Sequence, residues 1–360
     1  MSLSFGIRTI QDHFENDNIR VVVGLDFGTT HSGFAYCHIE DQDIRSYNSW
    51  NGALDSKPVE LFRLHLGDSL DEFKPELPVD YKKAITDFLR EIGEVIKETV
   101  ATCWPTIDYF KNVLLVITVP AEFSEKSKEI LRMCAFNAGL IKEKYSIYLQ
   151  FTTEHEAVAL YCMKNLGQTL ARPETNIMIV DCGDNRVDLT TRKLMTNEQL
   201  VGDKPMDLLR DNNYGQMQYL IQNFGKYGKI PFTGDDPGFS YELDIQETIP
   251  ILTQYITDDE IRKTLENDEW IIEIDFERMK SISEPVIQKI LHLIKAQLDN
   301  TQETYSAMFL VGSFSESKYL QKRVKEEFQY KVKIISVPEP IAAIARGAVI
   351  YGLSMKNMLH

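Results

Sequence analysis

Residues 21–36 read VVVGLDFGTTHSGFAY. The stretch opens with a continuous apolar run, which is typical of a strand buried on both faces. The run ends in Asp26, followed by Gly28, Thr29 and Thr30 and then by a second apolar run. A buried strand that ends in a carboxylate beside a glycine predicts a strand–turn–strand hairpin whose turn binds a ligand.

The same pattern returns in the second half of the chain. Residues 177–194 read IMIVDCGDNRVDLTTRKL, again a buried strand, an aspartate, a glycine two residues later and a returning strand. Strand–helix units follow both hairpins, so the repeat predicts a duplicated α/β lobe. The boundaries we expect are a polar tail over 1–19, lobe I over 20–172 with 338–360, and lobe II over 175–337 with a mostly helical insertion over 241–298.

Apolar periodicity and capping residues predict the elements between the hairpins. A helix is expected around 81–101, and the apolar run 113–120 predicts a fully buried strand. Ser124 and Gly139 are a plausible N-cap and C-cap of the next helix, and Ser315 is a plausible N-cap further on. A core stripe in the helical insertion is predicted from Val286, Ile287, Ile290, Leu291 and Ile294.

Charge and composition disfavour several classes of protein. The formal net charge of −15 over 360 residues repels phosphate backbones and anionic membranes, so neither is expected as a main partner. No apolar run approaches the roughly 20 residues needed to cross a bilayer, and the N-terminus lacks the apolar core of a signal peptide. Five separated cysteines without a C-x-x-C pair favour free thiols. We therefore expect a cytoplasmic protein.

The two aspartates suit a metal–phosphate site. Glycine lets backbone amides approach phosphate oxygens closely, whereas a carboxylate repels phosphate unless a divalent cation lies between them. Mg²⁺ prefers one or two carboxylates with waters and phosphate oxygens, which suits Asp26 and Asp181. Two such hairpins facing each other across a cleft would hold a polyphosphate from both sides. The alternative is structural, because Asp-x-Gly is also a common hairpin turn.

Six segments in order resemble the heat shock protein 70 family of the actin-like ATPase superfamily. GLDFGTTHSGFAY (24–36) resembles its first phosphate loop, and the segment 177–194 its second. VLLVITVPAEFSEKSKEILRMCAFNAGL (113–140) and VPEPIAAIARGAVIYGL (337–353) resemble its connecting segments, and AMFLVGSFSESKYLQ (307–321) its adenosine loop. TTEHEAVALYC (152–162) resembles a further family segment, with His155 in place of the usual proline. The sequences of these segments are most similar to those of the divergent cytosolic branch of the family.

The resemblance implies an α/β, two-lobed actin-like ATPase fold of duplicated ribonuclease-H-like lobes with a nucleotide cleft between them. It also implies ATP or ADP with Mg²⁺ as cofactors, and co-chaperone-like proteins as possible partners. Asp26 and Asp181 would hold Mg²⁺ through water, and Glu154 would position the attacking water. The nucleotide contacts it implies are Gly28, Thr29, Thr30 and Gly183 for phosphate, Gly312 and Ser313 for adenosine, and Asp259, Arg262, Lys263 and Glu266 as an adenine and ribose clamp. A solvated helix face explains that clamp equally well.

The chain also departs from the family pattern. Its second loop has Asp184, Asn185 and Arg186 where the family has glycines and a threonine. A carboxylate about 4 Å from a phosphate charge costs about 4 kcal/mol at an effective dielectric of 20, which Arg186 or a metal could offset in part. The segments after 50 and after 194 are short, and Lys57 cannot be placed as the family's catalytic lysine.

Three functions follow from these residues. The first is a nucleotide-binding protein of the heat shock protein 70 family, without a peptide-binding domain and with possible Mg²⁺-dependent ATP hydrolysis. The second is a degenerate pseudo-ATPase that acts as an interaction module, favoured by the altered second loop. The third is a small-molecule kinase on the same fold, since fold does not fix function. Phosphate release without an added acceptor separates the first from the third.

Overall fold

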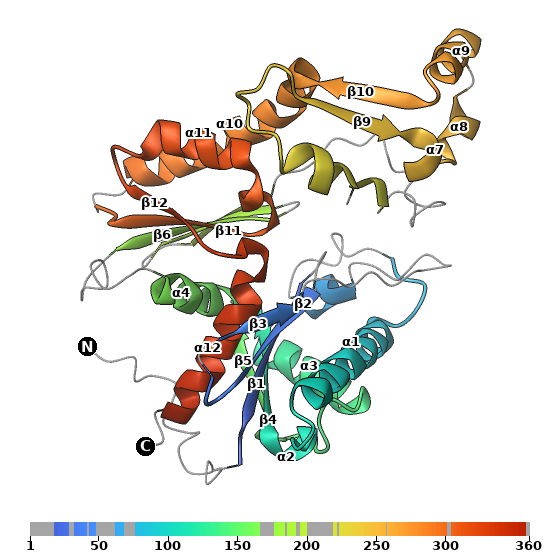
Figure 1. The fold of residues 1–360 in the computed structure, drawn as a ribbon. Helices are drawn as coiled ribbons and strands as arrows, with labels where there is room; N and C mark the ends of the chain where they lie inside the picture. Colours follow the sequence, from blue (N-terminus) through green and yellow to red (C-terminus); the bar gives the residue numbers. More distant parts are fainter. Residues whose placement is uncertain are drawn as a thin grey trace. The chain divides into compact units, whose positions relative to one another are not determined.

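The computed structural model describes residues 18–28, 32–41, 43–47, 62–67, 76–165, 176–183, 186–191, 195–199, 219–221, 223–256, 258–300 and 304–357. The fold is mixed α/β, as the sequence predicts, and is drawn in Figure 1. The chain divides into two compact units, one of residues 1–50, 59–165 and 342–360 and the other of residues 51–58 and 166–341.

The first unit contains five described strands and six helical elements. The strands are β1 (Val21–Phe27), β2 (Ser32–His38), β3 (Arg45–Tyr47), β4 (Val113–Val119) and β5 (Leu149–Thr153). The helical elements are the 3-10 helix η1 (Phe62–Leu66) and the α-helices α1 (Tyr81–Cys103), α2 (Tyr109–Asn112), α3 (Glu125–Asn137), α4 (Glu154–Lys164) and α12 (Ala343–Asn357).

The second unit contains a five-stranded sheet and a smaller two-stranded sheet. Its described strands are β6 (Ile177–Cys182), β7 (Arg186–Thr191), β8 (Met195–Gln199), β9 (Ser240–Asp244), β10 (Ile271–Asp275), β11 (Ala307–Val311) and β12 (Lys333–Ser336). Its helical elements are η3 (Phe224–Lys229), α7 (Ile245–Thr248), α8 (Leu252–Tyr255), α9 (Asp259–Asn267), α10 (Phe276–Asn300), η4 (Ser313–Glu316), α11 (Lys318–Phe328) and η5 (Pro340–Ala342) at the unit's end.

The two five-stranded sheets have the same topology. The strand order is β3-β2-β1-β4-β5 in the first unit and β8-β7-β6-β11-β12 in the second. In each sheet the hairpin strands pair antiparallel, and the central strand, β1 or β6, also pairs parallel with the next strand of the sheet. The repeat of the Asp-x-Gly pattern in the sequence therefore corresponds to a repeat of sheet topology.

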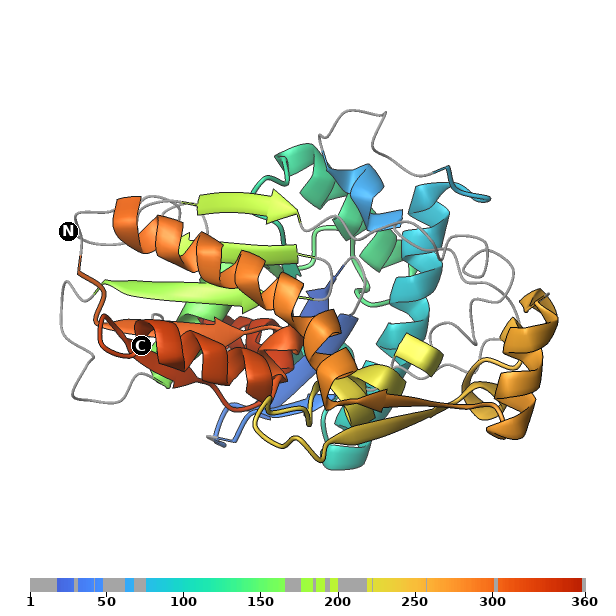
Figure 2. The same ribbon diagram turned by 90° about the horizontal axis from the view of Figure 1, so that it is seen from above.

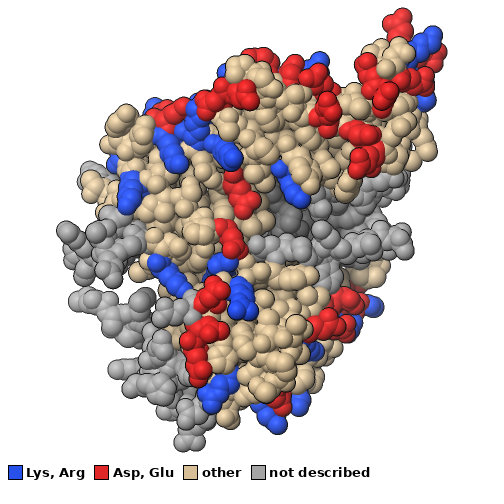
Figure 3. All heavy atoms as spheres, viewed as in Figure 1, with Lys and Arg blue, Asp and Glu red and all other residues tan. Residues whose placement is uncertain are grey.

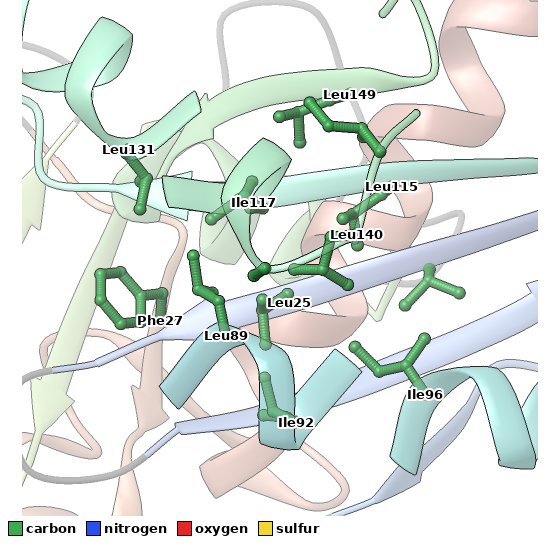
Figure 4. Packing of buried hydrophobic residues seen from close by; sticks show 14 of the residues in the cluster. Leu25, Phe27, Leu89, Ile92, Ile96, Leu115, Ile117, Leu131, Leu140 and Leu149 are labelled. Atoms are coloured by element: carbon green, nitrogen blue, oxygen red, sulfur yellow. The ribbon is translucent and has the colours of Figure 1, made fainter. Parts of the chain in front are cut away.

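Helices cover both faces of the first unit's sheet. On one face, α1 and α3 pack against β1 and β4, and Figure 4 shows Leu25 and Phe27 meeting Leu89 and Ile92 of α1. On the other face lie α4 and α12, and a Cβ atom at Gly24 of β1 would lie 2.4 Å from the carbonyl oxygen of Ala345. The central strand is thus buried on both sides, as its continuous apolar run predicts.

Helices α10 and α11 lie over one face of the second unit's sheet, as Figures 1 and 2 show. The predicted core stripe of α10 is confirmed at four of its five positions, which are Ile287, Ile290, Leu291 and Ile294. It is wrong at Val286, which is 38% exposed because it lies at the margin of the apolar face. The insertion expected to be mostly helical also contains the β9–β10 pair.

Most of the remaining element predictions agree with the structure. Helix α1 covers the predicted range, and Ser124 caps α3 by accepting a hydrogen bond from the amide of Ser127. All five cysteines are free thiols. Ser315 is not an N-cap: its hydroxyl donates to the carbonyl oxygen of Gly312, and Ser317 caps α11 instead. Among the described residues, no helix is long and apolar enough to span a membrane.

Candidate functional site

The predicted site residues of each unit gather at one edge of its sheet. In the first unit β1, β4 and β5 run parallel, so Asp26 near the end of β1 and Glu154 just after β5 lie at the same edge. In the second unit β6, β11 and β12 run parallel, which places Asp181 and Gly312 at one edge as well. Ligands of α/β sheets bind outside the carboxyl ends of the strands, which is this edge.

Asp26 is half-buried at the penultimate position of β1. Its Oδ1 atom accepts a hydrogen bond of 3.3 Å from the hydroxyl of Thr118, which is buried on β4. The amide of Gly28 donates to Ser32 Oγ at 3.2 Å and closes the start of the hairpin. These contacts fix the carboxylate at the sheet edge. Thr29 and Thr30 lie outside the described residues.

Glu154 is the first residue of α4, and a capping box holds that helix start. The amide of Glu156 donates to Thr153 Oγ1 at 3.1 Å, and the amide of Thr153 donates to Glu156 Oε2 at 3.1 Å. Reciprocal bonds of this kind satisfy two backbone donors at a helix N-terminus. The position of Glu154 at the end of β5 therefore follows from the local sequence.

Arg63 of η1 is a site residue that sequence analysis missed. Its Nη2 atom donates to Glu154 Oε1, and the two side chains are only 8% and 13% exposed. The Arg63 guanidinium also lies 5.9 Å from the ring centroids of both Phe27 and Phe123. Glu154, predicted to position a water molecule, is thus engaged by a buried arginine. A single arginine in the apolar segment FRLHL was the signal available in the sequence. Lys57 lies outside the described residues.

Asp181 is the penultimate residue of β6, as Asp26 is of β1. It is half-buried, and in the sheet register it faces Asp188 of β7 and Val311 of β11. A Cβ atom at Gly312 would lie 2.3 Å from Asp181 Oδ1, so only glycine fits this approach. Gly312 also has φ +85°. Gly312 is therefore placed against the carboxylate, and Ser313 follows it as the first residue of η4.

The turn of the second hairpin is described only in part. Gly183 is half-buried directly after β6, and Arg186 begins β7. Asp184 and Asn185 lie outside the described residues. Burial raises the pKa of the Cys182 thiol, the negative charge of Asp181 raises it further, and the positive charge of Lys229 lowers it.

Lys229 is a second residue that the sequence did not indicate. It ends the helical turn η3, and its Nζ atom lies 3.7 Å from the centroid of the Phe314 ring. Phe314 follows Gly312 by two residues and is 6% exposed. No motif surrounds Lys229 in the sequence, so only the fold brings it to the Asp181 strand end.

The four predicted clamp residues lie on α9. Arg262 donates to the carbonyl oxygens of Thr253 at 2.8 Å and Ile256 at 3.2 Å, and its guanidinium lies 5.9 Å from the Trp270 ring. Arg262 thus joins α9 to its neighbouring segment. Figure 3 shows acidic and basic side chains together at the corner where Figure 1 places α9. The clamp made of Asp259, Arg262, Lys263 and Glu266 stays a prediction.

The residues present suit a hydrated magnesium ion better than a cage of protein ligands. Within the described residues, no group of three or more His, Cys, Asp or Glu is arranged to hold a metal ion. Each sheet instead offers an aspartate at the end of its central strand, close to a glycine, with a threonine hydroxyl next to Asp26. Mg²⁺ keeps several waters and binds through one or two carboxylates and substrate phosphates. Asp26 in the first unit and Asp181 in the second are each, taken separately, carboxylates of the kind that would bind Mg²⁺ through water, and the ion itself stays a prediction.

The sequence is similar to those of known proteins along most of its length. No model of a protein family matches the chain. Heat shock 70 kDa protein 12A from Homo sapiens and its Mus musculus counterpart are each 21% identical to it, in alignments covering 94% of this chain and 70% of the relative. Heat shock 70 kDa protein 12B from Homo sapiens is also 21% identical, over 92% of this chain and 68% of the relative.

The relatives are longer than this chain within the aligned region. The alignment with the human 12A protein runs over 475 residues, whereas the whole chain has 360. The relatives thus carry more than a hundred residues without a counterpart here. The chain is thus similar, at 21% identity along nearly its full length, to heat shock 70 kDa proteins 12A and 12B.

Proposed function

We propose that the chain is a nucleotide-binding protein of the actin-like ATPase fold, which binds ATP or ADP with Mg²⁺ through its two Asp-x-Gly hairpins. The observation that carries the proposal is the matched position of Asp26 and Asp181. Each is the penultimate residue of the central strand of a five-stranded sheet, and each is followed by an apolar residue and a glycine. Sequence similarity to the heat shock 70 kDa proteins supports the same function.

Each group has a defined part in this proposal. Bound Mg²⁺ would neutralise phosphate charge beside the two carboxylates. The Thr118 hydroxyl orients the Asp26 carboxylate, and the backbone of Gly28 leaves room for a phosphate oxygen. Gly312 keeps the backbone close to Asp181, where a side chain would displace the carboxylate.

A specific observation favours a second candidate, a nucleotide-binding module that hydrolyses ATP slowly or not at all. The Glu154 carboxylate accepts a hydrogen bond from the buried Arg63 guanidinium. A carboxylate oxygen that already accepts a hydrogen bond from a guanidinium has less capacity to accept one from an attacking water. The altered residues 184–186 point the same way. Phosphate release from ATP measures hydrolysis directly. We expect a rate well below that of a protein in which no arginine engages the equivalent carboxylate.

Isothermal titration with ATP and ADP, each with Mg²⁺ and with excess chelator, tests nucleotide binding. Wild-type protein should bind both nucleotides, and Asp26→Asn should weaken binding in Mg²⁺ by about tenfold or more, because a charged ligand group is lost. Asp43→Asn is the matched control, since the Asp43 side chain is 81% exposed before β3 and belongs to no predicted site. Absence of heat at millimolar nucleotide, with the protein folded by circular dichroism, contradicts nucleotide binding.

A further inference from the structure

A cavity of about 350 Å³ lies in the first unit, at the edge of the sheet where its parallel strands begin. Its walls come from α2, from the first residues of β4 and from the segment 140–148 that leads into β5, and Figure 1 shows α2 at the beginning of β4. Val113 at the start of β4 pairs with Val21 at the start of β1, whereas Asp26 lies near the other end of β1. The cavity is therefore separate from the candidate nucleotide site.

The cavity has the size and the lining of a site for a small molecule. Val113, Leu115 and Leu140 form a buried apolar part of its wall, and the rings of Tyr109 and Phe110 add aromatic surface. Pockets for small molecules typically have volumes of about 300–1,000 Å³ and mostly apolar and aromatic walls. An apolar cavity of about 150 Å³ already holds benzene. This cavity therefore has room for one ring with a substituent.

The irregular wall of the cavity, segment 140–148, is held in place by α3. Arg132 of that helix donates hydrogen bonds to the carbonyl oxygens of Ser146 at 3.2 Å and of Leu149 at 3.1 Å. These bonds fix the end of the segment before any ligand arrives. A wall that is already ordered loses little conformational entropy on binding, which favours affinity for a small ligand.

Tyr109 contributes an unsatisfied polar group beside this apolar wall. Its hydroxyl oxygen is buried and has no hydrogen-bond partner among the described residues. Burial raises the pKa of Tyr109, so the hydroxyl stays protonated and can donate as well as accept. A buried polar group without a partner is costly, and nearly all such groups in proteins are paired. A ligand oxygen would satisfy this hydroxyl once the Tyr109 side chain turns toward the cavity.

The charges around the cavity favour a neutral ligand. Lys142 and Glu143 both line it and are both exposed, so its rim carries one charge of each sign. The net charge of −15 on the whole chain also repels anions. We propose that this cavity binds a small neutral ring compound with one hydrogen-bonding oxygen, whose ring lies against the apolar wall and whose oxygen pairs with the Tyr109 hydroxyl.

The test uses two ring compounds of nearly the same shape, phenol and toluene, which differ in having a hydroxyl or a methyl group on the ring. Binding to the full chain is followed by NMR of labelled Ile, Leu and Val methyl groups, because Val113 and Leu115 report directly on the cavity. Tyr109→Phe removes only the hydroxyl. Tyr145→Phe is the matched control, since Tyr145 also lines the cavity but its hydroxyl already donates to Glu129 Oε1 at 3.1 Å.

Both compounds should shift the methyl signals of Val113 and Leu115 in the wild-type protein. Tyr109→Phe should lower the preference for phenol over toluene by about fivefold, which corresponds to one hydrogen bond, and Tyr145→Phe should leave that preference unchanged. Thermal unfolding should find Tyr109→Phe at least as stable as wild type, because the variant lacks a buried hydroxyl without a partner.

Two results would overturn the proposal. Methyl signals of the cavity that stay unshifted by both compounds, up to the solubility of toluene, would show that no ring compound binds there. A preference for phenol that is the same in wild type and Tyr109→Phe, or that falls equally in Tyr145→Phe, would remove the hydroxyl from the site and with it the proposed ligand class. Either result leaves nucleotide binding at the opposite edge of the sheet intact.

Discussion

Arg63 and Glu154 form a buried ion pair between segments 91 residues apart in the sequence. The pair joins η1 to the first residue of α4, and the rings of Phe27 and Phe123 flank the guanidinium. Removing one member of a buried pair leaves a charge without that partner in a medium of low polarity. The pair therefore contributes to the stability of this sheet edge, and under the proposed function it also limits how Glu154 contacts water.

Arg63→Met should destabilise the protein by about 3 kcal/mol, the lower end for a broken buried pair. Urea unfolding followed by circular dichroism measures the change. Arg90→Met is the control, because Arg90 pairs with Asp87 on the exposed side of α1 and should cost at most about 0.5 kcal/mol. Adding Glu154→Gln to Arg63→Met should recover part of the loss, since the buried charge is then gone. A cost below about 1 kcal/mol for Arg63→Met would show that the pair is unimportant for stability.

Gly312→Ala should be more destabilising than Gly139→Ala. Both glycines have positive φ, +85° and +73°, so both alanines bear a backbone penalty of about 1–2 kcal/mol. A Cβ atom at Gly139 meets nothing within 4 Å, whereas at Gly312 it meets Asp181 Oδ1 and the Cys182 carbonyl oxygen. The difference in unfolding free energy between the two variants thus measures the close approach at Asp181. Equal costs would show that this approach is relaxed easily.

Local sequence determined the elements that were predicted well. The central strands β1 and β6 are continuous apolar runs, and each hairpin is closed by residues adjacent in the chain, so both sheets could be anticipated. The parts played by Arg63 and Lys229 could not be anticipated, because each makes a tertiary contact with a distant segment and neither lies in a recognisable motif. The β9–β10 pair was missed for a similar reason, since α7, α8 and α9 separate its two short strands.

Thr153→Ala should lower the stability of the first unit by about 1 kcal/mol, because α4 loses the side chain that caps it. Thr99→Ala is the control within a helix. The Thr99 hydroxyl donates to the carbonyl oxygen of Val95 in the interior of α1, where alanine is a better helix former, so this change should be neutral or slightly stabilising. Urea unfolding distinguishes the two. Equal effects would mean that the capping box does not hold the start of α4.

Glu284 of α10 should make stability depend on pH in the acidic range. Burial would raise the pKa of Glu284, but hydrogen bonds from Arg323, Tyr319 and Gln288 outweigh it and lower that pKa from 4.5 to about 2. A depressed carboxyl pKa stabilises the fold above the unfolded value, and the contribution is lost as the pH falls from 4.5 towards 2. Glu284→Gln should therefore be less stable than wild type by about 1–2 kcal/mol at pH 7, with a gap that narrows below pH 4.5.

Glu326→Gln separates this effect from general loss of surface charge. Glu326 Oε2 lies 3.5 Å from the Nε atom of the same Arg323, but its side chain is 53% exposed. An exposed pair contributes at most about 0.5 kcal/mol, so this variant should follow the wild-type pH profile closely. Urea unfolding between pH 3 and pH 7 compares the three proteins, with pH 3 chosen because it lies between the two pKa values of Glu284. A gap between wild type and Glu284→Gln that stays constant over this range would mean that the carboxyl titrates alike in the folded and unfolded chain.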